Sequence, residues 1–85
     1  MEDLGPAFGR RVRALRERLQ LSQEQVAERA ELHWTYVSGI ERGKRNPGLN
    51  TIARLARALG VTPGSLLDDL HPSPVTRPKA RTKTG

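Results

Sequence analysis

The sequence contains no cysteine, which excludes a disulfide framework, a thiolate metal site and a cysteine nucleophile. Its two histidines, His33 and His71, are too far apart for the usual spacing of metal ligands. We therefore expect no metal and no other cofactor. Aromatic residues are also scarce, and apolar residues make up only 35% of the 85 residues. A chain this short buries a small core, so pairing with a second copy is one way to bury more apolar surface.

Long apolar runs are absent as well. No segment approaches the length of a membrane span, and the first residues lack the pattern of a signal peptide. We expect a cytoplasmic protein without a membrane partner. The residue sets that enzymes use are also missing: there is no catalytic pair of carboxylates, no Ser/His/Asp set and no glycine-rich loop that could hold phosphates. We therefore predict that the protein is not an enzyme.

Positive charge is what the sequence has in excess, with a formal net charge of +6. Residues 71–85 hold four basic residues and no acidic one, whereas residues 1–70 hold 11 basic and 9 acidic residues. The last segment is also rich in proline and has almost nothing to bury. We predict that residues 71–85 form a disordered tail. Net charge alone favours polyanions in general and does not distinguish among them.

Apolar residues recur at helical spacing along residues 6–70, the predicted folded part. Phe8, Val12, Leu15 and Leu19 form one stripe at spacings of four, three and four. The opposite face of that segment is mostly arginine, for which phosphate contact and plain solvent exposure both stay open. No strand-like alternation of useful length occurs, so we predict an all-α fold. The expected helices cover about residues 6–20, 23–30, 34–42, 49–59 and 63–70.

Local signals mark several helix ends. Ser22 and Gln25 fit the capping box, in which the serine and the glutamine three residues later satisfy each other's backbone N–H groups. Thr62 has the character of an N-cap for the last helix. Gly43 and Gly60 suit the left-handed position that follows a helix, so we expect them to end the third and fourth helices.

Residues 23–42 join two short helices through about three residues. Val26 and Ala27 position the first helix, and Val37 and Ile40 position the second. The small side chain of Ala27 lets the two helices cross closely. This is the helix-turn-helix arrangement, in which the second helix enters the major groove of double-stranded DNA.

Residues 8–70 resemble the phage-repressor helix-turn-helix family, also called Cro/C1 or XRE type. The resemblance rests on Ser-Gln-Glu-Gln-Val-Ala at 22–27 and on Thr-Tyr-Val-Ser-Gly-Ile-Glu-Arg-Gly-Lys-Arg-Asn-Pro at 35–47. The first nine residues of the second run are most similar to the controller proteins of restriction–modification systems. The resemblance implies a five-helix, lambda-repressor-like DNA-binding domain. The sequence departs from the family at Glu31, where glycine is common, and at Trp34, where controller proteins carry a polar or basic residue.

The second helix of the motif carries the residues that we expect to meet DNA. Thr35 and Ser38 have short hydroxyl side chains that can hydrogen-bond to base edges or phosphates. Trp34 could pack on a sugar or a thymine methyl group, or donate its indole N–H to a phosphate; covering the edge of the core is the alternative. Tyr36 could reach a phosphate or a base, or pack between helices. Gly39 has no side chain, which would let the helix approach the DNA closely.

Phosphate contacts are expected near the ends of the two helices. The resemblance implies that Gln23 contacts the DNA backbone and braces the second helix, and a helix N-terminus also suits phosphate; a simple capping role is the alternative. We expect four further residues around the end of the second helix to hold phosphates: Arg42, Lys44, Arg45 and Asn46.

The resemblance also assigns a structural role to Glu41, at the end of the helix expected over residues 34–42. It implies that Glu41 is buried against a basic residue of the helix expected over residues 6–20. Arg10 and Arg13 are the candidates for that partner.

The last predicted helix is more apolar than one short terminal helix needs. Part of Leu66, Leu67 and Leu70 must pack on the first and fourth helices. We expect the surplus to form the contact between two copies of the chain. Such a homodimer would place its two recognition helices about 34 Å apart, on successive major grooves.

These expectations combine into a sequence-specific transcriptional regulator, a repressor or an autoregulatory controller, that binds an inverted-repeat operator as a homodimer. No small-molecule ligand is expected because no second domain is present to hold one, so protein concentration would control activity. The basic tail either follows DNA phosphates or only aids solubility, or is a cloning remnant.

The alternative from another class is a protein-binding module of the antitoxin or bridging type on the same fold. Residues 71–85 would then be the contact segment, although they offer only Val75 as an apolar anchor. RNA binding is less favoured, since the aromatic residues form no stacking platform.

Overall fold

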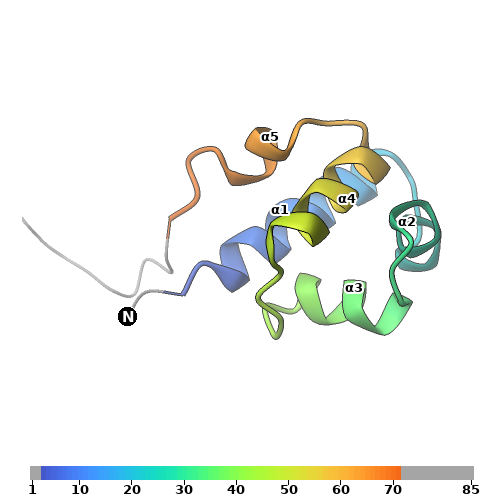
Figure 1. Cartoon of the computed structure of the whole chain (residues 1–85), viewed down its shortest axis with the longest axis horizontal. Helices are drawn as coiled ribbons and strands as arrows, with labels where there is room; N and C mark the ends of the chain where they lie inside the picture. Colours follow the sequence, from blue (N-terminus) through green and yellow to red (C-terminus); the bar gives the residue numbers. More distant parts are fainter. Residues whose placement is uncertain (1–2, 72–85) are drawn as a thin grey trace, which may run out of the picture.

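The structure, a computed structural model, describes residues 3–71, which fold into five α-helices without a strand (Figure 1). The helices are α1 (Gly5–Arg18), α2 (Gln23–Ala30), α3 (Trp34–Glu41), α4 (Leu49–Leu59) and α5 (Pro63–Leu67). The predicted all-α, five-helix fold is thus confirmed for this part of the chain. The predicted tail, residues 71–85, lies outside the described residues except for His71.

Side-chain caps lie at both positions predicted for them, at the starts of α2 and α5. Ser22 Oγ accepts a hydrogen bond from the backbone N–H of Gln25 at 3.0 Å, and the Gln25 side-chain oxygen accepts from the Ser22 N–H at 2.8 Å. The predicted capping box before α2 is therefore confirmed. At the start of α5, Thr62 Oγ1 accepts from the backbone N–H of Ser65 at 3.1 Å, as expected of an N-cap.

Left-handed residues follow the ends of all five helices. Gly43 and Gly60 have φ angles of 74° and 72°, as predicted for the residues that stop α3 and α4. Glu31 ends α2 in the same conformation, with φ of 59° and ψ of 44°. A side chain at such a position crowds its own backbone, so Glu31 carries strain that a glycine would avoid. Two residues after Arg18, Gln20 is also left-handed, which ends α1 earlier than predicted.

The last helix is shorter than predicted. It stops at Leu67 rather than near residue 70, because Asp68 is extended and Asp69 is left-handed with φ of 57°. The guanidinium group of Arg11 in α1 donates to the carbonyl oxygens of Ser65 and Asp68. Arg11 therefore satisfies backbone acceptors that the end of a helix leaves free, and it ties α5 to α1.

One hydrophobic core joins all five helices. Its largest fully buried side chains are Val12, Val26, Val37, Ile40, Leu55 and Leu66. α1 packs mainly on α3, α2 contacts both α3 and α4, and α4 packs on α5. This arrangement leaves α3 along one side of the molecule and α5 on the opposite side (Figure 1). Within residues 3–71, no helix is long and apolar enough to cross a membrane.

A glycine allows α1 and α3 to approach closely. A Cβ atom at Gly9 would lie 2.2 Å from the carbonyl oxygen of Ile40 and 2.8 Å from that of Glu41. Both oxygens belong to the backbone of α3, so they cannot turn away as the end of a flexible side chain could. Gly9 therefore sets the position of α3 on α1, a role that its place beside Phe8 in the sequence did not indicate.

Candidate nucleic-acid interface

α3 turns one face to the core and one to solvent. Val37 is buried, whereas Trp34 leaves 48% of its surface exposed and Thr35 is exposed beside it. Ser38 and Tyr36 are half-buried on the flanks of the helix. Tyr36 also packs against the core, so the packing role considered for it is present. The start of α3 is thus its most accessible part.

The first turn of α3 is held by a residue to which we had assigned no role. His33 is the N-cap: its Nδ1 atom accepts a hydrogen bond from the backbone N–H of Thr35 at 3.2 Å. Thr35 Oγ1 lies 2.8 Å from the same nitrogen. Histidine is not among the side chains that usually cap helices, so only its place directly before Trp34 could have indicated this role.

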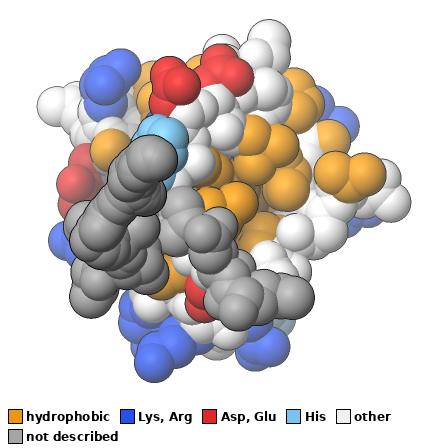
Figure 2. All heavy atoms as spheres, turned by 90° about the vertical axis from the view of Figure 1, so that its left-hand side faces the viewer, with side chains coloured by type: hydrophobic (Ala, Val, Ile, Leu, Met, Phe, Trp, Pro, Cys, Tyr) orange, Lys and Arg blue, Asp and Glu red, His pale blue; other side chains and the backbone are white. Residues whose placement is uncertain are grey.

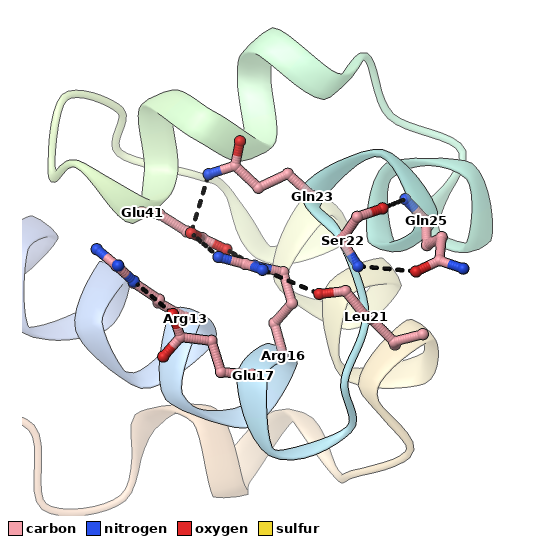
Figure 3. Close-up of polar contacts among 8 residues, drawn as sticks. All are labelled: Arg13, Arg16, Glu17, Leu21, Ser22, Gln23, Gln25 and Glu41. Carbon is pink, nitrogen blue, oxygen red and sulfur yellow. Dashed lines mark hydrogen bonds and ion pairs between the residues drawn. The ribbon is translucent and has the colours of Figure 1, made fainter.

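A buried ion pair holds the other end of α3 (Figure 3). Arg16 Nε lies 2.6 Å from Glu41 Oε2, and Arg16 Nη2 donates to Glu41 Oε1 at 2.9 Å. The two side chains are only 13% and 3% exposed, respectively. This bidentate hydrogen bonding raises the pKa of the Arg16 guanidinium above its ordinary value. The Arg16 guanidinium therefore stays protonated at any physiological pH.

The partner of Glu41 is not one of the two residues predicted for it. Arg13 pairs with Glu17 at 3.0 Å on the exposed face of α1, and Arg10 is exposed. Arg16 lies two helical turns after Gly9, on the side of α1 that faces α3, which explains why its side chain reaches Glu41. The expectation that Glu41 is buried against a basic residue of α1 holds, whereas Arg10 and Arg13 were wrong.

Gln23 extends this network to the start of α2. Its Nε2 atom donates to Glu41 Oε1 at 3.0 Å, and Arg16 Nη1 donates to the carbonyl oxygen of Leu21 at 2.9 Å (Figure 3). One carboxylate thereby links the end of α1, the entry to α2 and the end of α3. The N-cap of α2 is Ser22, so the alternative of a capping role for Gln23 is wrong.

The close approach to DNA predicted for Gly39 stays a prediction, and the structure shows what lies beside this residue. Gly39 is buried, and a Cβ atom placed on it would lie 2.8 Å from Cγ of Arg45. The missing side chain therefore makes room for Arg45. The Arg45 guanidinium lies over the ring of Tyr36, 5.7 Å from its centroid, in a cation–π contact.

Exposed polar and basic residues surround the end of α3, where they were predicted. They are Arg42, Lys44, Arg45 and Asn46. Figure 2 shows Lys and Arg side chains gathered along the edge of the molecule on which α3 lies in Figure 1. This edge combines positive charge with the exposed start of a helix, which are the two features that polyanion binding in a groove requires.

Apolar side chains collect on a second surface, at the end of the molecule where α1 begins (Figure 2). Leu4 and Leu67 are 44% and 42% exposed, respectively. A shallow groove on this surface, the apolar groove, is lined by Leu4, Gly5, Phe8, Asn46, Pro47, Ile52, Leu67 and Leu70. Leu66, which is predicted with Leu67 and Leu70 to contact a second copy, is 0% exposed within the core and has no surface left for that contact.

Comparison with known proteins adds to this geometry. Residues 7–70 match the family described as a helix-turn-helix domain. The chain is 48% identical over 62 residues to the control protein C.BamHI of Bacillus amyloliquefaciens, a match that covers 72% of this chain and 76% of that protein. It is 39% identical over 72 residues to the control protein C.MunI of a Mycoplasma species, covering 84% and 97% of the two chains.

A solved structure gives the same result in three dimensions. The restriction–modification controller protein C.AhdI from Aeromonas hydrophila has a TM-score of 0.71 and 47% sequence identity to this chain. The match covers 75% of this chain and 96% of C.AhdI.

Proposed function

The chain belongs to the helix-turn-helix domain family and is a DNA-binding transcriptional regulator, and from this premise we propose that it binds a two-fold symmetric operator as a homodimer. The observation that carries the proposal is the arrangement of α3, whose exposed start lies on the same edge of the molecule as four exposed polar and basic residues.

In this proposal the start of α3 reads the bases. Trp34, Thr35 and Ser38 offer an indole and two hydroxyl groups to the major groove, where hydroxyl groups can meet base edges. Tyr36 contributes from the flank, where its ring also supports Arg45. Gly39 takes part only indirectly, by leaving room for the Arg45 side chain.

Phosphate contacts position α3 in the groove. We assign them to Gln23, which Glu41 holds at the start of α2, and to the residues after α3: Arg42, Lys44, Arg45 and Asn46. The stacking of Arg45 on Tyr36 supports this assignment, because a side chain that is already ordered loses less conformational entropy on binding.

Two copies would meet through the apolar groove. Leu4, Leu67 and Leu70 line it, and Leu4 and Leu67 are also exposed to solvent. Apolar side chains that are this exposed and this close together are typical of an interaction surface. A two-fold axis through this surface would carry both α3 helices toward one DNA duplex, with the recognition helices about 34 Å apart.

The regulatory outcome follows from this assembly. A dimer on an operator near a promoter acts as a repressor or as an autoregulatory controller, and its occupancy depends on the concentration of the chain. We place this activity in the cytoplasm, with DNA and a second copy as partners and no small-molecule ligand.

The experiment that tests the proposal is selection of bound duplexes from a random DNA library by the full chain. We expect an inverted repeat whose half-sites lie about one helical turn apart. A Thr35→Ala/Ser38→Ala double variant should lose base preference in each half-site while it keeps salt-sensitive, non-specific binding. If the variant kept the same preference, the assignment of the recognition helix would be wrong.

Failure of the wild-type chain to enrich any sequence would reject the operator. A partner protein that is retained through residues 71–85 would then favour the antitoxin-like or bridging alternative, and the same full chain can be used for that capture.

A further inference from the structure

The direction of one hydrogen bond in the first turn of α3 determines what Thr35 can recognise. The backbone N–H of Thr35 donates to Nδ1 of His33 at 3.2 Å. A ring nitrogen that accepts a hydrogen bond carries no proton, so the proton of the neutral imidazole is on Nε2. Thr35 Oγ1 lies 2.8 Å from the same Nδ1. In the tautomer that accepts the bond from the Thr35 N–H, Nδ1 has no proton to give, so the hydroxyl group of Thr35 is the donor in this contact.

This arrangement uses up the only proton of the Thr35 hydroxyl group. A threonine hydroxyl can donate once and accept through two lone pairs. With its proton directed at His33, Thr35 presents only acceptor capacity to any other group. Thr35 is exposed at the start of α3, the part of a recognition helix that contacts base edges.

The edges of bases in the major groove present both donors and acceptors. The donors are the exocyclic amino groups, N6 of adenine and N4 of cytosine, whereas N7 atoms and carbonyl oxygens accept. We propose that His33 fixes Thr35 as a hydrogen-bond acceptor, so that Thr35 recognises the amino group of an adenine or a cytosine in each half-site. This inference rests on the proposed function and adds the atom that is read. His33 is then a positioning residue, which acts on specificity through Thr35.

A helix cap with no role in recognition would affect only the stability of α3. The two possibilities separate in a double-mutant cycle. Thr35→Val removes the hydroxyl group and keeps the backbone N–H that His33 caps. His33→Ala removes the acceptor and releases the hydroxyl proton, so the side chain can again donate. His33→Asn restores a side-chain oxygen that can accept both bonds.

The measurement is the affinity of these variants for the selected duplex and for copies of it that lack one exocyclic amino group each. Purine replaces adenine, and 2-pyrimidinone replaces cytosine. We expect wild-type affinity to fall roughly tenfold on loss of one particular amino group in each half-site. Thr35→Val should bind both duplexes equally, His33→Ala should lose most of the discrimination, and His33→Asn should restore it. The double variant Thr35→Val/His33→Ala should show the same lack of discrimination as Thr35→Val alone.

A matched control is available in the capping box of α2. Ser22→Ala removes a cap of the same kind and should lower thermal stability while it leaves the amino-group discrimination intact. The proposal is overturned if the selected operator contains no amino group that wild type distinguishes, or if His33→Ala keeps the full tenfold effect. If wild type selects no operator at all, the proposed function fails together with this inference, whereas an operator without amino-group discrimination overturns only the inference.

Discussion

Among single residues, Glu41 is the one for which loss of its charged partner should lower the stability of the fold most. Its side chain is 3% exposed, and Arg16 and Gln23 both donate to it. Removing the positive charge would leave a buried carboxylate without its counter-ion. We expect Arg16→Met to lower the free energy of unfolding by about 3–5 kcal/mol, measured by urea denaturation.

The second ion pair of α1 provides the control for that change. Arg13 Nε and Glu17 Oε2 lie 3.0 Å apart, but these side chains are 63% and 54% exposed. Because water and salt screen this pair, Arg13→Met should cost less than about 1 kcal/mol. Equal losses in the two variants would contradict a structural role for the Glu41 network.

Glu31 is a residue at which the chain is less stable than it could be. It adopts a left-handed conformation that glycine adopts without strain. Glu31→Gly relieves the strain in the folded state, which stabilises the protein. Glycine also raises the conformational entropy of the unfolded chain, which offsets part of that stabilisation. We expect a net stabilisation of about 0.5–1 kcal/mol, seen as a rise in Tm of about 2–6 °C by circular dichroism. Gly60→Ala, which places a side chain in the same conformation, should shift Tm in the opposite direction.

Between whole elements, the contact of α1 with α3 has the least room for change. A methyl group at Gly9 would meet the backbone of α3 at 2.2 Å, so the two helices would have to separate. We expect Gly9→Ala to cost about 2 kcal/mol or more in urea unfolding and to weaken DNA binding, since α3 would move. At Gly64 a Cβ atom would meet only Thr62 Oγ1 at 3.9 Å, so Gly64→Ala is the matched control and should be neutral or slightly stabilising. An unchanged stability of Gly9→Ala would mean that the helices can repack.

The elements themselves could be predicted well from the sequence, because their signals are local. The cap at Ser22 and the glycine at position 60 lie within a few residues of the helix ends that they determine. Long-range choices could not be predicted in this way. Spacing does not distinguish Arg16 from Arg13 as the partner of Glu41, since the answer depends on how α1 is rotated against α3. The attachment of α5 to α1 likewise depends on Arg11, which is 54 residues away from Ser65 in the chain.

For the molecule as a whole, the resemblance to phage-repressor-like regulators and to restriction–modification controllers is confirmed by the family match and by C.AhdI. The residue types and their spacing across 22–47 were enough to establish it. The DNA-contacting residues stay a prediction, as does the pairing of two chains. Of the three leucines predicted for that pairing, Leu66 belongs to the core, whereas Leu67 and Leu70 line the apolar groove.

Two leucines of similar exposure, one in the apolar groove and one away from it, provide a test of whether two chains pair through the groove. Leu67 lines the apolar groove and is 42% exposed, whereas Leu19 is 46% exposed at the other end of α1. We expect Leu67→Ser to raise the Kd of the dimer roughly tenfold, in keeping with the loss of part of one buried leucine. Sedimentation equilibrium over a range of concentrations measures this change. Leu19→Ser should leave the Kd as it is, and an equal effect of both variants would argue against pairing through the groove.

The residues that anchor α3 are different from those that it exposes. Val37 and Glu41 hold the helix from inside, whereas Trp34 and Thr35 make up its outer start. Substitutions at the outer positions therefore leave the scaffold unaffected. A lineage of such proteins can acquire a new target sequence through one or two codon changes without first gaining stability to spare. Duplicated copies in one cell could thus diverge into regulators that ignore each other's sites.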